Sequence, residues 1–155
     1  MQNPLRGALA ALLLTPLMLA AEPAPDFAIT ELDTTVHELS QERLVYLDFW
    51  ASWCGPCRHS FPFMNELKAK FEDKGLTVVA VNVDVEPADA EPFLAKYPAD
   101  FTLHYDPEGA IAEAYAVPGM PTSYLIRNGE ILERHIGFRK SQTQALFDEI
   151  EGYLP

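Results

Sequence analysis

Residues 47–57 read LDFWASWCGPC, and they join a predicted buried strand to a predicted helix. The strand is predicted over residues 43–51, because a nearly continuous apolar run is typical of a strand that is covered on both faces. Beyond Cys57 the pattern predicts an amphipathic helix that Gly75 ends, since large apolar residues recur every three or four positions, at Phe61, Met64, Leu67 and Phe71. The centre of the fold is therefore expected to be a strand, a turn with two cysteines, and a helix.

Strands and helices are expected to alternate along the rest of the chain. Residues 76–83 predict a second buried strand, which should lie parallel to the first because a helix connects them. The Asn128-Gly129 pair predicts a β-hairpin, and Ser141 is expected to cap a last helix that runs to about Tyr153. The other expected elements are strands at Phe27–Thr30 and around Val36, helices over residues 87–97 and 110–116, and strands over residues 101–105, 122–127 and 130–137.

This order predicts an α/β fold with a central mixed β-sheet flanked by helices on both faces. One domain is expected, over residues 22–155, beginning with a short linker at Glu22–Pro25. A signal peptide is expected at residues 1–21, because Arg6 precedes an uncharged run that is shorter than the span of about 20 apolar residues that crosses a membrane. The protein is therefore expected in the periplasm or secreted; the alternative is an uncleaved membrane anchor, which Pro16 disfavours.

The composition limits both the partners and the role of the cysteines. The 155 residues include 11 lysines and arginines against 23 acids, so the formal net charge is -12 and no nucleic acid is expected as a partner. The only two cysteines are Cys54 and Cys57. A bond between them would close a very small loop and constrain little of the unfolded chain. Their role is therefore expected to be local chemistry.

The Cys-Gly-Pro-Cys spacing favours thiol–disulfide exchange. One helical turn between two cysteines brings both sulfurs to the same side, close enough to bond. Cys54 is expected at the helix N-terminus, where unpaired N–H groups and the helix dipole stabilise a thiolate, and Cys57 is placed to resolve the mixed disulfide. Pro56 suits the first helical turn, and Gly55 lets another backbone approach.

Other chemistries of a cysteine pair lack their partners in this sequence. Zinc needs two further ligands, but there is no third cysteine, and the four histidines lie on separate expected elements, at His37, His59, His104 and His135. Covalent haem needs a histidine where Arg58 stands. Neither a metal nor a cofactor is therefore expected, although binding of Cu(I) by the two soft thiolates remains an alternative.

Several motifs resemble those of the thioredoxin superfamily. Besides the stretch quoted above, Pro62 stands where that family carries the proline of its first helix, and Asn82-Val83-Asp84 fits the end of the matching strand. Gly119-Met120-Pro121-Thr122 resembles the loop that holds the family's cis-proline. The expected signal peptide, the N-terminal strand pair and an extra helix–strand unit at about residues 87–105 resemble the secreted TlpA/ResA-like thioredoxins. The resemblance implies a thioredoxin-like fold.

The resemblance also implies roles for charged residues near the cysteines. Asp48 matches the buried carboxylate that lies beneath the pair and accepts the proton of Cys57, and its burial should raise its pKa. The lysine that thioredoxins place near this carboxylate is replaced by Ala80. Glu86 stands where relatives often carry a second acid.

A substrate groove is implied beside the cysteines. Pro121 is expected to follow a cis peptide bond, which leaves the Met120 backbone free to pair with an extended substrate. Trp53 is expected to form a wall of the groove because it directly precedes Cys54; the alternative is a core aromatic. Gly55 and Pro56 are also expected to contact the substrate, and Trp50 is expected in the core.

Together these features predict a periplasmic thiol:disulfide oxidoreductase that reduces protein disulfides, for example in cytochrome c maturation or at copper-site thiols. The Gly-Pro dipeptide is that of reducing thioredoxins, whose potential is about -270 mV. The resemblance implies that electrons come from a membrane donor of the DsbD or CcdA type. A dithiol oxidase and a Cu(I)-binding thiol chaperone are the alternatives.

Overall fold

The structure, a computed structural model, describes residues 21–155. Apart from its last residue, the predicted signal peptide lies outside the described residues. Within residues 21–155, none of the helices combines the length and the apolar character that crossing a membrane requires.

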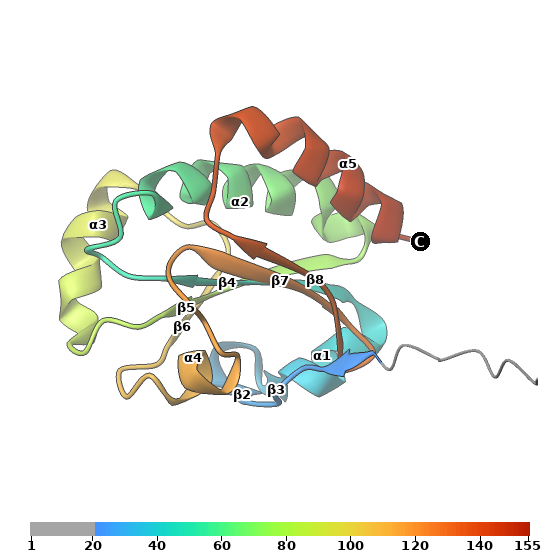
Figure 1. The fold of residues 1–155 in the computed structure, drawn as a ribbon, viewed down its shortest axis with the longest axis horizontal. Helices are drawn as coiled ribbons and strands as arrows, with labels where there is room; N and C mark the ends of the chain where they lie inside the picture. The colour runs from blue at the N-terminus through green and yellow to red at the C-terminus, as the bar shows by residue number, and fades with distance from the viewer. Residues whose placement is uncertain (1–20) are drawn as a thin grey trace, which may run out of the picture.

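A six-stranded mixed sheet forms the middle layer, in the order β1-β8-β7-β4-β5-β6 (Figure 1). Strand β4 (Leu44–Trp50) lies parallel to β5 (Leu76–Asn82) on one side and antiparallel to β7 (Thr122–Arg127) on the other. All of β4 is buried, which explains its unbroken apolar run. The outer strands are β6 (Thr102–Tyr105), parallel to β5, β8 (Glu130–Ile136), antiparallel to β7, and β1 (Glu22–Pro23), antiparallel to β8. The predicted mixed sheet and its parallel pair are confirmed.

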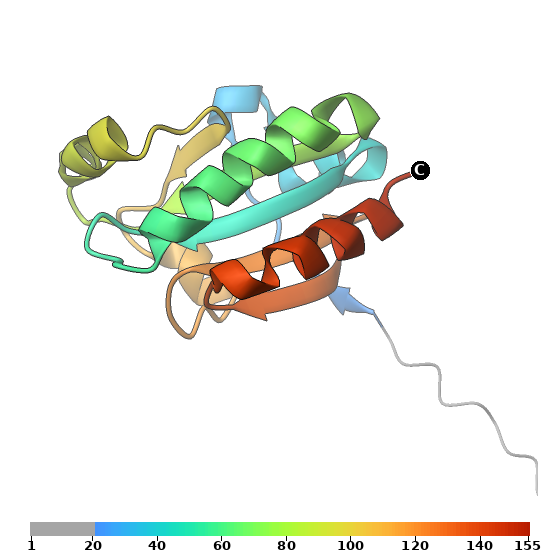
Figure 2. The same ribbon diagram turned by 90° about the horizontal axis from the view of Figure 1, so that it is seen from above.

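Helices cover both faces of the sheet, as predicted. Helices α2 (Cys57–Phe71) and α5 (Thr143–Tyr153) lie side by side over one face (Figure 1, Figure 2). Helices α1 (Val36–Glu42) and α4 (Ala110–Ala114) lie on the other face, together with a small two-stranded sheet. Helix α3 (Glu91–Lys96) lies beyond the carboxyl end of β4 on the same side as α2, and it belongs with β6 to the predicted helix–strand unit.

The N-terminal segment differs from the prediction in one element. The predicted strand pair exists, as β2 (Ala28–Ile29) antiparallel to β3 (Thr34–Thr35). The strand expected around Val36 is wrong, because Val36 begins helix α1. The Thr35 hydroxyl accepts a hydrogen bond from the Glu38 N–H, and the Glu38 carboxylate accepts one from the Thr35 N–H, each at 3.2 Å. This capping box starts the helix directly after β3.

Two other expectations about the ends of the domain are wrong. The expected linker at Glu22–Pro25 includes strand β1, which pairs with the edge of β8, and the Ala24 N–H then donates to the Gly129 carbonyl oxygen at 2.9 Å. Ser141 does not cap the last helix. It lies within a 3-10 turn that leads into α5, and no side chain of residues 21–155 caps the N-terminus of that helix.

Candidate active site

The two cysteines lie where the chain leaves the carboxyl end of β4 and enters α2. The Cys54 N–H donates to the Ala51 carbonyl oxygen at 3.1 Å, and the Cys57 N–H donates to the Cys54 carbonyl oxygen at 3.2 Å. Pro56 directly precedes α2 and already has helical dihedral angles, with φ at -64° and ψ at -25°. The two cysteines form a disulfide with an S–S distance of 2.03 Å and a Cα–Cα distance of 5.4 Å.

The two sulfurs differ in access. Cys57 is fully buried at the start of α2, whereas Cys54 keeps 4% of its surface exposed and lines an open groove. An external disulfide can therefore reach Cys54 but not Cys57. The space beside Gly55 is open, because a Cβ atom at that position would meet no atom of residues 21–155 within 4 Å beyond its chain neighbours.

Asp48 is a buried carboxylate on the same side of the sheet as the cysteines. It is only 1% exposed. The neighbouring residues of β4 face the core on the other side of the sheet, so the Asp48 side chain points with Tyr46 and Trp50 toward α2. Its Oδ2 atom has no hydrogen-bond partner in residues 21–155. On β5 it stands directly opposite Ala80, which supplies no charge. Burial without a cation raises the pKa of Asp48 well above its ordinary value.

The loop before β7 lies at the carboxyl end of β4, because Thr122, the first residue of β7, pairs with Phe49. The Met120–Pro121 peptide bond is cis, as predicted. The Gly137 N–H donates to the Pro121 carbonyl oxygen at 2.8 Å, and the Thr122 hydroxyl donates to the Gly119 carbonyl oxygen at 2.6 Å, so both ends of the loop are fixed. Within residues 21–155, the backbone of Met120 has no backbone partner. An extended peptide can pair with these free groups.

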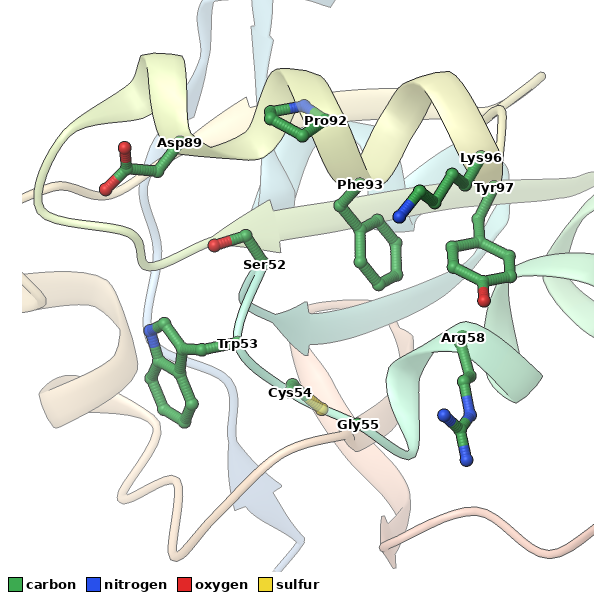
Figure 3. Close-up of a pocket in the computed structure, with 10 residues that line it drawn as sticks. All are labelled: Ser52, Trp53, Cys54, Gly55, Arg58, Asp89, Pro92, Phe93, Lys96 and Tyr97. Carbon is green, nitrogen blue, oxygen red and sulfur yellow. The ribbon is translucent and has the colours of Figure 1, made fainter.

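A groove runs from Cys54 toward α3 (Figure 3). Trp53, which is 70% exposed, stands on one side of the loop, and Phe93 and Tyr97 point from α3 toward the loop on the other. The charged residues of the lining are Arg58, Lys96 and Asp89. Trp53 and Gly55 line this groove, and their contact with a substrate stays a prediction. The residues from α3 were missed, because the position of that helix is set by long-range packing. Trp50 lies fully in the core, as predicted.

The groove carries positive charge although the chain as a whole is acidic. Arg58 and Lys96 form no ion pair with a side chain of residues 21–155, whereas Lys68, Lys70 and Lys74 do. The pKa of the neighbouring His59 is lowered, first by partial desolvation and then by the charges of Lys140 and Arg58. Arg58, His59 and Lys140 line one pocket near the start of α2. An acidic group of a partner would be attracted here.

A second buried aspartate, Asp84, holds the cysteine loop. It accepts a hydrogen bond from the Ser52 N–H at 2.9 Å, one from the Ser52 hydroxyl at 2.9 Å, and one from the Asn82 side-chain amide at 2.7 Å. These bonds tie the loop after β4 to the end of β5. The Asn82-Val83-Asp84 motif was recognised in the sequence, but its positioning role was not.

The predicted second acid, Glu86, lies at the edge of this region. It is exposed and directly precedes a 3-10 turn, and Asp89, rather than Glu86, lines the groove. The described residues contain no group of three or more potential ligands that could hold a metal ion.

Comparison with known proteins places this geometry in context. The sequence profile of the family described as Redoxin matches residues 19–150. The chain is 34% identical over 140 residues to the thiol-disulfide oxidoreductase ResA of Bacillus cereus. This match covers 88% of the present chain and 78% of the Bacillus protein. It is 35% identical over 140 residues to ResA of Oceanobacillus iheyensis, covering 86% of this chain and 70% of that protein.

Solved structures give the same assignment of fold. A crystal structure of a putative thiol:disulfide interchange protein DsbE from Chlorobium tepidum has a TM-score of 0.79 and 49% sequence identity, and it covers 85% of this chain and 95% of that one. A solution structure of a putative thioredoxin from Neisseria meningitidis has a TM-score of 0.71 and 26% identity, covering 86% of this chain and 90% of that one. The fold is thus thioredoxin-like, as predicted.

Proposed function

Because this chain belongs to the Redoxin family and is a thiol:disulfide oxidoreductase of the ResA/DsbE type, we propose that it acts as a reductant of protein disulfides outside the cytoplasm. The observation that carries the proposal is the asymmetry of the pair. Cys54 is open to a groove, while Cys57 is buried on the side of the sheet toward which the unpaired Asp48 carboxylate points. Such an arrangement separates the sulfur that attacks from the sulfur that resolves.

In the proposed reaction, the Cys54 thiolate attacks one sulfur of a substrate disulfide, and the other substrate sulfur leaves as a thiolate that takes a proton from solvent. Cys57 then gives its thiol proton to the Asp48 carboxylate and attacks the Cys54 sulfur. The second substrate thiolate leaves, and the Cys54–Cys57 disulfide forms. Two electrons pass from the enzyme dithiol to the substrate, and no cofactor takes part.

The groove supports a polypeptide substrate. We expect an extended segment to pair with the Met120 backbone beside Pro121 and to lie against Trp53, with Gly55 and Pro56 leaving room for its backbone. The Arg58 and Lys96 side chains, which form no ion pair within residues 21–155, favour a substrate with acidic residues near its disulfide. Reduced apocytochrome or copper-site thiols are the proposed products.

The proposed location and electron supply rest on the signal peptide expected at residues 1–21. In an oxidising compartment a reductant must be recharged from the cytoplasmic side, so a membrane donor of the DsbD or CcdA type is the proposed partner.

The reduction potential of the Cys54–Cys57 pair tests the direction of electron flow. We expect a value near that of reducing thioredoxins, about -270 mV, when the protein is equilibrated with a redox buffer and the thiols are counted by alkylation. A value near that of strong oxidants, about -120 mV, would make the protein a dithiol oxidase. Tight binding of Cu(I) with no reductase activity would instead favour a copper chaperone.

A further inference from the structure

Three polar side chains lie next to one another across β4, β7 and β8. Ser123 on β7 stands directly opposite Asp48 on β4, and His135 on β8 stands directly opposite Ser123. Directly opposed residues of antiparallel strands point to the same face, with their Cβ atoms about 5 Å apart. The three side chains therefore form one row on the face that α2 and α5 cover.

Two more polar side chains join this row. Glu149 of α5 places its Oε1 atom 2.9 Å from Nε2 of His135. Burial and the Asp48 carboxylate raise the pKa of the Tyr46 phenol far above its ordinary value, a hydrogen bond with Ser123 lowers it, and the Glu149 carboxylate raises it. Tyr46 stands two residues before Asp48 on β4, so its side chain points to the same face of the sheet. We call Asp48, Tyr46, Ser123, His135 and Glu149 the buried polar row.

The two ends of the buried polar row differ in their access to solvent. At the inner end, Asp48, Tyr46 and Ser123 are each at most 4% exposed. At the outer end, the side chains of His135 and Glu149 are 22% and 34% exposed, and both line a surface pocket between β8 and α5. The row therefore leads from the buried carboxylate to a surface pocket that shares no lining residue with the groove beside Cys54.

The row is unusual because the rest of this core is apolar. Helix α2 faces it with Cys57, Ser60 and apolar side chains, and β5 faces it with Ala80. The other charged groups on this face of β8 are Glu130, which stands opposite Arg127, and Glu133, whose carboxylate already accepts a hydrogen bond from the Tyr153 hydroxyl at 2.6 Å. In residues 21–155, three atoms of the row have no hydrogen-bond partner: Asp48 Oδ2, His135 Nδ1 and Glu149 Oε1. On the same face, Trp50 Nε1 also has none. Buried polar atoms without a hydrogen-bond partner are rare in folded proteins, and they often mark a catalytic role.

We propose that the buried polar row carries protons between Asp48 and solvent. The inference rests on the proposed function, in which Asp48 takes the proton of Cys57 while a substrate covers the groove in front of the cysteines. The proton then passes from the Asp48 carboxyl group to a hydroxyl of Ser123 or Tyr46, which accepts it and donates its own proton onward. The His135 imidazole receives it and releases it, beside Glu149, to solvent. The row moves protons only; the electrons stay with the sulfurs.

Chemical rescue tests the proposal directly. In His135→Ala the outer carrier is lost from a residue that lines an open pocket, so a small base from solvent can take its place. We expect the resolution of a mixed disulfide, followed by stopped-flow tryptophan fluorescence at low buffer concentration, to slow by about tenfold, less than the 10²–10⁴-fold loss typical when a general base is removed. Added imidazole should restore the rate with saturation. His135→Gln, which keeps a hydrogen-bonding side chain, should be equally slow.

Two variants separate conduction from structure. His104→Ala is the matched control, because His104 also lies beside a carboxylate, 2.8 Å from a Glu31 oxygen. His104 is on β6, opposite a residue whose side chain belongs to the core on the other face of the sheet. This variant should neither slow the reaction nor respond to imidazole. The double variant Ser123→Ala/Tyr46→Phe removes both inner hydroxyls, and imidazole should not rescue it. Wild-type rates in His135→Gln at every buffer concentration, or a slow His135→Ala that imidazole does not restore, would overturn the proposal. An Asp48→Asn variant that resolves the mixed disulfide normally would instead overturn the base assignment of the proposed function.

Discussion

Replacing Asp48 by asparagine should make the protein more stable and less active, and the gain in stability should depend on pH. The side chain keeps its shape but loses its titrating proton. Asp48 is 1% exposed, faces no cation, and leaves one oxygen atom without a hydrogen-bond partner in residues 21–155. Burial raises its pKa well above the ordinary value of 3.8, because the charged form loses its hydration. The wild-type protein therefore has to keep this group protonated or bury its charge.

The size of the effect follows from proton binding. Between pH 3.8 and the raised folded-state pKa, the folded protein holds a proton that the unfolded chain has lost. The folded state then binds more protons, so the free energy of unfolding falls as pH rises, by about 1.4 kcal/mol per pH unit within this window. Below the window both states are protonated, and above it both are ionised. Asparagine removes this slope, so the advantage of the variant should grow with pH and then become constant.

Denaturant unfolding of oxidised wild type and Asp48→Asn, repeated from pH 4 to pH 9, measures that difference. In the same variant the insulin-reductase rate should fall by about 10²–10⁴-fold near neutral pH, and by less at pH values where the Cys57 thiol ionises unaided. Asp106→Asn, which changes a buried aspartate that accepts the Ala112 N–H at 2.9 Å, should keep the wild-type rate. A stability difference that does not change with pH, or reductase rates that equal those of the wild type from pH 6 to pH 9, would refute the reasoning.

Three further predictions concern the cysteines, the groove and the N-terminus. Cys57→Ser should accumulate a mixed disulfide with substrate on non-reducing gels, and Cys54→Ser should not; the reverse result would exchange their roles. The double variant Arg58→Glu/Lys96→Glu reverses the groove charges, so it should lower kcat/KM by about tenfold for a disulfide peptide with Asp beside its cysteine. The same variant should raise kcat/KM for the matched peptide with Lys at that position. Arg127→Glu, at the far end of β7, should leave kcat/KM unchanged for both peptides. Mass spectrometry of the exported protein should show that the first 20 or 21 residues are missing, and an intact N-terminus in the membrane fraction would contradict this.

The centre of the fold could be predicted because its signals are local. A strand buried on both faces is an apolar run, and one charge within that run, Asp48, marks a carboxylate that the sheet must bury. Short elements gave no such signal. Helix α1 begins at Val36, the last of three consecutive β-branched residues, Thr34, Thr35 and Val36, which favour a strand. Only the capping box formed with Glu38 starts the helix there. Strand β1 has two residues and exists because β8 offers it an edge.

The groove needed tertiary structure. Cys54 and Trp53 could be placed beside the substrate because they adjoin the predicted loop, but Phe93 and Tyr97 reach that loop from α3. Phe93 is held there by aromatic packing, with its ring centroid 5.0 Å from that of Trp50. No periodicity in residues 87–97 indicates which face of that helix turns toward the cysteines, since the choice depends on residues about 40 positions away.

The buried polar row was beyond prediction for a more specific reason. The Asn128-Gly129 turn pairs Arg127 with Glu130, and a regular hairpin continued from that pair would set Ser123 opposite Arg134. A one-residue irregularity between Leu125 and Ile126 shifts the register, so that Ser123 meets His135 instead. Because a shift of one residue exchanges the two faces of a strand, the irregularity turns His135 toward α5 and Arg134 toward the ring of Tyr124, on the other face. Without it, an arginine would occupy the outer end of the row, and an arginine keeps its proton at every pH at which the enzyme could work. The same feature that hides the row from sequence patterns therefore places an imidazole, the type of side chain that most often shuttles protons in enzymes, at its outer part.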